Sequence, residues 1–198
     1  MIQVQLNKSH GDRIPLFETE RLYTREFEQS DFDRLEEIRL HPEFYYRTLN
    51  KNTKTEAFLE DANKGKEIEN GQRKYYRIAA CLKNSDELIG QAYLGLFHFS
   101  ILDIRAIGLG VFIAPKNQRK GFAKELFVSS INFAFEQYDQ EIEIISMAHP
   151  DNVPSIKLHQ VADFKYMQSG NLNSETNLPE NDRKLFKLTR EKWNKLKK

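Results

Sequence analysis

One stretch of the sequence, from Lys116 to Lys124, places a glycine among four basic side chains. It follows an apolar, strand-like run, and apolar residues then recur every three or four positions, which predicts a helix from about Arg119 to Gln137. The first N–H groups of a helix lack internal partners and attract anions. Gly121 would let a ligand approach the backbone closely. The pattern therefore predicts a phosphate or diphosphate site, with a solvated basic helix face as the alternative.

A second group of polar residues opens another predicted helix further along the chain. Asn152 stands where an N-cap is expected. Ser155 and His159 are one turn apart and so share a helix face. A histidine can donate a proton near neutral pH. The single cysteine, Cys81, lies in an apolar run and is expected to be buried, and no metal site is predicted.

The apolar periodicity of the chain predicts the elements that would position these candidates. Strand-like and helix-like stretches alternate, without an internal repeat or a linker long enough to divide the chain. We expect one α/β domain with a mixed sheet, covering residues 1–198 with its core at about 17–190. The predicted strands are 21–27, 74–82, 88–99, 106–114, 141–148, 164–168 and 183–189, and the predicted helices are 30–40, 55–65, 119–137 and 152–162.

Composition places the chain among ordinary globular proteins. Of its 198 residues 39% are hydrophobic and 30% are charged, and the formal net charge is +1. Such a balance gives no general attraction to nucleic acid or to anionic membranes. Residues 1–11 lack the apolar stretch of a signal peptide, and no apolar run approaches the roughly 20 residues that a membrane helix needs. We expect a cytoplasmic protein with neither a nucleic-acid nor a membrane partner.

The hexapeptide Gln118-Arg119-Lys120-Gly121-Phe122-Ala123 resembles the phosphate loop of the GCN5-related N-acetyltransferase (GNAT) superfamily, Gln/Arg-x-x-Gly-x-Gly/Ala. Three further segments are similar to that superfamily and follow in its order, so the resemblance covers about Thr19 to Phe164. It implies a single GNAT-type domain with a mixed, mostly antiparallel sheet of about seven strands and helices on both faces. The three segments are Leu109 to Pro115, like the strand before the loop; Asn152 to Ser155 with Asp163-Phe164, like the segment after the fifth strand; and Glu18 to Arg25, like the first strand in relatives of the RimJ/RimL kind.

The resemblance also implies a co-substrate, acetyl-CoA, in a V-shaped opening between the strands before and after the loop. Its pantetheine arm would meet main-chain atoms of Val111, Phe112 and Ile113, together with the side chain of Asn152. No metal is implied. The residues expected to hold the diphosphate are Gln118, Arg119, Lys120, Gly121, Phe122 and Ala123.

Acylation of an amine requires a neutral nitrogen, a polarised thioester carbonyl and a proton for the departing thiolate. Many relatives supply this proton from a tyrosine, and the matching position here is His159. Ser155 is a second candidate, and water or the substrate itself is a third. None of these routes needs a covalent enzyme intermediate.

Two positions depart from the family pattern. Gly108 stands where many relatives carry a glutamate base. Asp163 replaces the glycine of the family's Gly-Phe pair, and since aspartate tolerates a left-handed backbone, we expect the turn to survive. Nearby alternatives for a base are Glu87, Asp103 and His98.

These features favour an N-acetyltransferase, acting as a monomer or homodimer, that moves an acetyl group to a primary amine. The acceptor would be a protein N-terminal amine or a small amine, and Phe44, Tyr45 and Tyr46 stand where relatives build its wall. One alternative is a non-catalytic acetyl-CoA-binding module. Another is a nucleic-acid-binding domain that uses the loop cations and the basic tail from Lys184 to Lys198. The simpler interpretation of that tail is a last strand followed by a solvated end.

Overall fold

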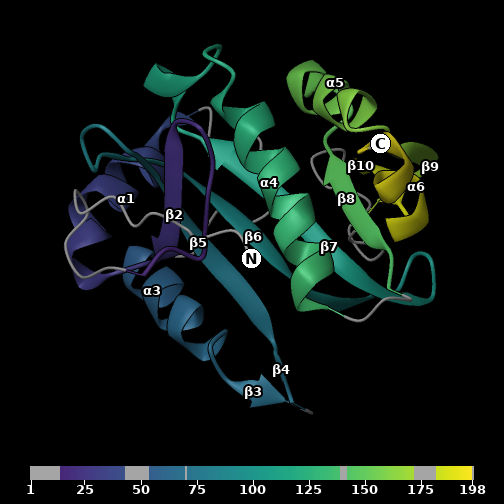
Figure 1. Ribbon diagram of the computed structural model, residues 1–198, viewed down its shortest axis with the longest axis horizontal. Helices are drawn as coiled ribbons and strands as arrows, with labels where there is room; N and C mark the ends of the chain where they lie inside the picture. Colours follow the sequence, from purple (N-terminus) through teal and green to yellow (C-terminus); the bar gives the residue numbers. More distant parts are fainter. Residues whose placement is uncertain (1–13, 43–53, 70, 139–141, 172–181, 198) are drawn as a thin grey trace.

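The computed structural model describes residues 14–42, 54–69, 71–138, 142–171 and 182–197. Its centre is an eight-stranded sheet with the order β1-β2-β5-β6-β7-β8-β10-β9, beside a two-stranded ribbon of β3 and β4 (Figure 1). Neighbouring strands are antiparallel except β7 and β8, which are parallel. The strands are β1 (Phe17–Glu18), β2 (Leu22–Glu26), β3 (Ile68–Glu69), β4 (Gln72–Arg73), β5 (Tyr75–Leu82), β6 (Leu88–Phe99), β7 (Ile104–Ile113), β8 (Ile144–Ala148), β9 (Lys165–Asn171) and β10 (Asp182–Leu188).

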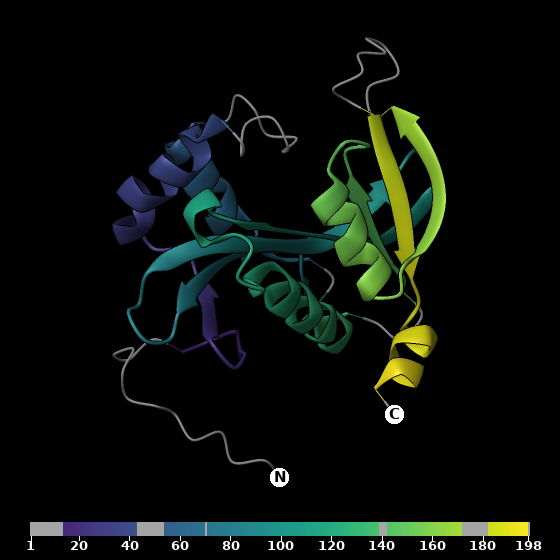
Figure 2. The same ribbon diagram turned by 90° about the horizontal axis from the view of Figure 1, so that it is seen from above.

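Helices cover both faces of the sheet (Figure 2). On one face, α1 and α3 pack over β2 and β5, with Phe58 at the centre of an apolar cluster. On the other face, α4 contributes Leu126 and Ile131, both fully buried, to a larger cluster. The helices are α1 (Phe32–Leu40), α3 (Thr55–Lys64), α4 (Phe122–Gln137), α5 (Val153–Val161) and α6 (Arg190–Leu196), with 3-10 turns η2 (Gln29–Asp31) and η3 (Pro115–Asn117).

The parallel strands β7 and β8 meet over a short length. Ile107 pairs with Ile144 and Gly108 pairs with Ile145, and beyond these residues the two strands part. Strand β8 stays paired with β10 along its whole length, from Ile144 to Ala148. The long connection that parallel strands require is α4. The sheet therefore opens on the carboxyl side of the β7–β8 contact, beside the start of α4.

The predicted α/β class, with a mixed, mostly antiparallel sheet and helices on both faces, is confirmed. The sheet has eight strands where about seven were expected, since the two-residue strand β1 pairs with β2 at the edge. The long helix begins at Phe122 rather than at about Arg119. The reason is that Arg119 and Gly121 have φ angles of 64° and 86°, which a right-handed helix does not contain.

The end of the chain differs from the predicted solvated end. Thr189 caps a further helix, α6, by accepting a hydrogen bond from the Lys192 N–H at 3.2 Å. The Trp193 side chain is buried, and its indole N–H donates to Asn132 of α4 at 2.8 Å. Part of the basic tail is therefore a helix docked on the domain, and its tryptophan was the signal for this in the sequence.

The structure also tests the predictions for Cys81, for Asp163 and for membrane-spanning helices. Cys81 is fully buried in β5, as predicted. Asp163 adopts a φ of 58°, the left-handed backbone predicted for its position. No helix in the described ranges is long and apolar enough to cross a membrane. The assignment of the whole chain to one domain stays a prediction.

Replacing Trp193 with alanine should lower the free energy of unfolding by about 3–5 kcal/mol, the usual cost of deleting a buried aromatic side chain. Trp193→Phe keeps most of the packing and loses the hydrogen bond to Asn132, so about 1–2 kcal/mol should be lost. Urea denaturation followed by circular dichroism measures both values. An alanine variant as stable as the wild type would show that α6 adds nothing to the folded core.

Candidate functional site

Alternate residues of β7 direct their main-chain groups to opposite sides. Ala114, just after β7, donates its N–H to Ile89 of β6 at 2.7 Å, whereas Ile107 donates to Glu143 on the β8 side at 2.9 Å. Even-numbered residues therefore bond to β6 and odd-numbered residues face β8 or the opening. This corrects the expectation for Phe112: its main chain faces β6, and its side chain lines the opening instead.

Along the open edge of β7, side chains donate hydrogen bonds to two main-chain carbonyl groups, and the main chain of one residue between them faces the opening. The Leu109 carbonyl accepts from the Ser146 hydroxyl at 2.7 Å. The Ile113 carbonyl accepts from the Gln118 amide at 2.9 Å. Val111 lies between them, beyond the last residue that pairs with β8. Its N–H and carbonyl thus face the opening, as an added strand or an amide-bearing ligand would require.

The loop between η3 and α4 presents a row of unpaired N–H groups. Arg119 and Gly121 are left-handed, and the N–H groups of residues 119–124 bond to nothing in the described part of the chain. Left-handed residues among ordinary ones turn successive N–H groups to the same side and form a concave anion site. The positive end of the α4 dipole adds to it. The predicted diphosphate loop therefore has donors that fit a diphosphate.

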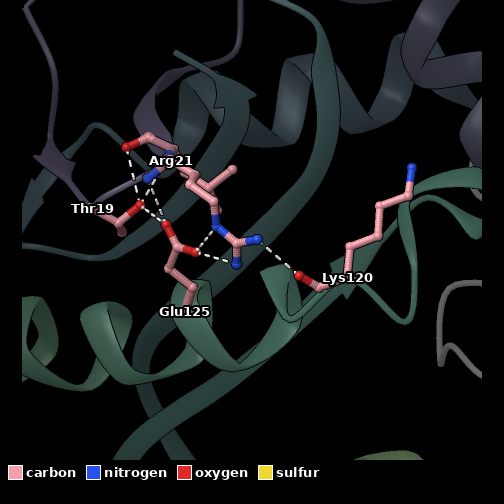
Figure 3. A network of polar contacts seen from close by, with 5 residues as sticks. Thr19, Arg21, Lys120 and Glu125 are labelled. Atoms are coloured by element: carbon pink, nitrogen blue, oxygen red, sulfur yellow. Dashed lines mark hydrogen bonds and ion pairs between the residues drawn. The ribbon is translucent and has the colours of Figure 1, made fainter. Parts of the chain in front are cut away.

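A cavity of about 740 Å³ fills the opening, between β6, β7 and the loop on one side and β8 and α5 on the other. Two predicted residues do not line it: Phe122 is buried in the core, and the Lys120 side chain extends away from the loop (Figure 3). The predicted residues that do line it are Val111, Phe112, Ile113, Gln118, Arg119, Gly121, Ala123, Asn152, Ser155 and His159.

The charged side chains around this cavity are basic. Arg119 and Lys124 lie at the loop, Lys157 comes from α5, and Arg183 comes from β10. Among the described residues that line the cavity there is no carboxylate. Such a surface attracts a polyanionic ligand and offers no carboxylate to take a proton from an amine.

Asn152 and Ser155 lie together at the start of α5. The Asn152 side chain accepts a hydrogen bond from the Ser155 N–H at 3.2 Å, so the predicted N-cap is confirmed. Both residues also line the cavity. A hydroxyl at this position can donate a hydrogen bond to a ligand in the opening.

His159 is held in the core by rings and by two polar contacts. Its exposed fraction is 2%, and its ring stacks on Phe186 at 4.4 Å between centroids. Nδ1 lies 2.7 Å from the Ser155 carbonyl and Nε2 lies 2.7 Å from the Ser146 hydroxyl. Burial lowers the pKa of His159 to about 4, although the hydrogen bond to Ser155 acts in the opposite direction. The imidazole is therefore neutral at pH 7, and both nitrogens already have partners.

Sequence reasoning missed the aromatic side of the cavity. Tyr93, Phe97 and Phe99 of β6 line it, beside Gly108 and Gly110 of β7. A Cβ at Gly108 would lie 2.6 Å from the Phe97 ring, so a side chain at this position would require the ring to move. Around a Cβ at Gly110 nothing lies within 4 Å, so open space remains there. The sequence did contain a signal for this wall: the aromatic residues occupy odd-numbered positions of a predicted strand, so they share one face of it.

The other groups suggested as bases do not line the cavity. Glu87 forms ion pairs with Arg34 and Lys116 at 3.3 and 3.0 Å. His98 and Asp103 contact each other at 3.1 Å near the exposed turn between β6 and β7. The aromatic residues expected at the acceptor wall, Phe44, Tyr45 and Tyr46, lie outside the described residues.

A protein-family model, the acetyltransferase (GNAT) domain, matches residues 21–165, which is more than half of the 198 residues. The match includes β2, the loop, α4 and α5. No curated protein matches the chain in sequence.

Solved structures of acetyltransferases have a similar fold at low sequence identity. Spermidine N-acetyltransferase from Vibrio cholerae, in complex with CoA and spermine, has a TM-score of 0.70 and 18% identity, covering 87% of this chain and 98% of that one. RimJ from Mycobacterium smegmatis, in complex with CoA-disulfide, gives 0.68 and 17%, covering 90% and 85%. A GNAT-family acetyltransferase from Bacillus anthracis gives 0.67 and 18%, covering 88% and 98%.

The free energy of unfolding should fall as the pH is lowered from about 6.5 to about 4. In this window the histidine of the unfolded chain takes up a proton that the folded His159 does not. Protonation therefore stabilises the unfolded state relative to the folded state, by about 3 kcal/mol once the pH is below both pKa values. Urea denaturation at several pH values measures this slope. His159→Phe keeps the ring and should show a shallower slope. Parallel pH profiles would contradict a neutral, buried His159.

Proposed function

Because the chain belongs to the acetyltransferase (GNAT) family, we propose that it moves an acetyl group from acetyl-CoA to a primary amine. The observation that carries this proposal is the parting of β7 and β8 beside a loop whose N–H groups have no partner among the described residues. The cavity between them has room for a long, flexible ligand with an anionic end. A cytoplasmic location and a monomeric or dimeric state stay predictions.

In this proposal the residues of the opening hold the donor in two parts. The N–H groups of residues 119–124 and the side chains of Arg119 and Lys124 bind the diphosphate. Val111 pairs its main chain with an amide of the pantetheine arm, as a neighbouring strand would. This places the thioester further along the opening, near Ser155 and the aromatic side of the cavity.

The chemical step is a direct transfer. The amine nitrogen attacks the thioester carbonyl carbon, a C–N bond forms, and the C–S bond breaks as the thiolate leaves. A backbone N–H on the open edge of β7 stabilises the charge that develops on the carbonyl oxygen. Ser155, whose hydroxyl can donate a hydrogen bond, stabilises the departing thiolate. Water carries the amine proton away, since the described lining of the cavity lacks a carboxylate.

The acceptor amine would approach from the aromatic side of the cavity. Tyr93, Phe97 and Phe99 form an apolar wall there, and the open space at Gly110 leaves room for the amine beside β7. Aromatic faces can hold the ammonium form before it loses its proton. We propose a protein N-terminal amine or a small amine as the acceptor class.

Gly121→Glu should weaken CoA binding by about 100-fold or more, because the new carboxylate repels the phosphates at close range and any side chain is strained at a φ of 86°. Isothermal titration calorimetry with CoA measures the dissociation constant. Wild-type protein should also gain about 2.7 kcal/mol of stability with CoA at 100 times that constant.

A matched control tests whether the loss of CoA binding is specific to the loop, because it introduces the same charge and the same backbone strain elsewhere. Gly71 has a φ of 78°, and a Cβ added to it would have no atom within 4 Å. It lies in the β3–β4 ribbon, away from the cavity. Gly71→Glu should therefore leave CoA binding unchanged. If Gly121→Glu binds CoA as the wild type does, the loop is not the donor site. Binding of CoA without thiol release from acetyl-CoA across a panel of amines would favour a non-catalytic module.

Ser155→Ala should lower kcat by about 10²-fold and leave the KM for acetyl-CoA nearly unchanged, because a bond to the departing thiolate forms in the transition state. Steady-state kinetics with the best amine of the panel measures both constants. An unchanged kcat would exclude Ser155 from the chemical step.

A further inference from the structure

The segment before β2 is joined to the loop by a dense set of polar contacts outside the cavity (Figure 3). Arg21 directs Nε and Nη2 to one carboxylate oxygen of Glu125, at 2.8 and 2.6 Å. The Arg21 backbone N–H, at 2.8 Å, and the Thr19 hydroxyl donate to the other oxygen. These contacts join residues 104 to 106 positions apart in the sequence. They therefore hold the start of β2 against the first turn of α4.

The Arg21 guanidinium is fixed from more than one side. Burial would raise the pKa of Glu125, but hydrogen bonds from Thr19 and Arg21 outweigh it and hold this pKa below its ordinary value. Glu125 therefore stays ionised and remains a strong partner for the guanidinium. The guanidinium carbon also lies 4.4 Å from the centre of the Phe122 ring. An arginine held by a carboxylate and a ring has little freedom to move.

The remaining Arg21 nitrogen acts on the loop itself. Nη1 donates to the Lys120 carbonyl oxygen at 2.9 Å. A trans peptide is planar, and its N–H points opposite to its carbonyl. The N–H of Gly121 therefore points away from Arg21, toward the side where Gly121 lines the cavity. Since glycine accepts both signs of φ, this peptide could otherwise rotate at little cost and turn a carbonyl toward the anion site.

We propose that Arg21 is a positioning residue for the donor: it holds the Lys120–Gly121 peptide so that the Gly121 N–H faces the diphosphate, and Glu125 holds Arg21. This inference rests on the proposed function. Arg21 acts from outside the cavity, which it does not line. If loss of Arg21 left one loop in ten with the correct orientation, the dissociation constant of CoA would rise about tenfold.

Two substitutions of Arg21 test the geometry against the charge. Arg21→Met removes both, whereas Arg21→Lys keeps the charge but cannot bond Glu125 and the Lys120 carbonyl together as a planar fork does. Both variants should bind CoA about tenfold more weakly in isothermal titration. Binding of S-acetylpantetheine, which lacks the diphosphate, should not change. In kinetics the KM for acetyl-CoA should rise while kcat stays within about twofold.

Glu125→Ala distinguishes positioning from direct contact with phosphate. If Arg21 positions the loop, releasing it from Glu125 weakens CoA binding. If Arg21 binds phosphate directly, releasing it from its carboxylate leaves CoA binding equal or tighter. Arg73→Met is the matched control, since it breaks a comparable ion pair with Glu26, at 2.5 Å, away from the cavity.

The possible results distinguish failure of the proposed role of Arg21 from failure of the proposed function. Weaker CoA binding in Arg21→Met, Arg21→Lys and Glu125→Ala, with unchanged S-acetylpantetheine binding and a normal Arg73→Met variant, supports the proposal. Wild-type CoA binding in Arg21→Lys, or equal or tighter binding in Glu125→Ala, overturns it and leaves the proposed function intact. A wild-type protein that does not bind CoA overturns both. Thermal denaturation of each ligand-free variant shows whether a change in binding comes from unfolding.

Discussion

The parting of β7 from β8 is the constraint on which the rest of the site depends. Backbone N–H and carbonyl groups removed from water need partners, and a strand that loses its neighbour leaves a row of them unpaired. Ser146 and Gln118 satisfy the carbonyls of Leu109 and Ile113. The main chain of Val111 has no strand partner on this side among the described residues, which is why we propose the opening as a binding site.

The loop at the end of β7 depends on a similar balance. A left-handed residue other than glycine, here Arg119, costs about 1 kcal/mol or more and persists where surrounding contacts fix it. The next peptide, Lys120–Gly121, is held by a residue far away in the sequence: Arg21 reaches the Lys120 carbonyl, and Glu125 holds Arg21. The segment between β1 and β2 thus has a part in shaping a site that lies on the other side of the loop. Substitutions at Arg21 and at Glu125 are therefore expected to affect each other.

Local patterns in the sequence were enough for most of the long strands and helices and for the position of the loop, but not for α6 or the two-residue strands. The alternation of β6 gave its bounds, Leu88–Phe99, and the loop motif named residues that do line the cavity. The environment of His159 could not be predicted, because it depends on Phe127, Phe164 and Phe186 from three separate elements. Main-chain direction at Phe112 depends on strand register, which side-chain identity does not reveal. The docking of α6 likewise depends on a distant partner, Asn132.

The two sides of the cavity differ in the groups that they offer, and no carboxylate is found among its described lining residues. In the proposed function main-chain groups would hold the donor, and this constrains a few backbone conformations, such as the one at Gly121, more than the identity of side chains. A site made of main-chain groups tolerates many side-chain changes, which fits a fold shared with acetyltransferases at only 17% to 18% sequence identity. On the other side, the Phe97 ring occupies the space that a side chain at position 108 would need. In the proposed mechanism water would remove the amine proton, and transfer would depend on holding the reacting atoms in place.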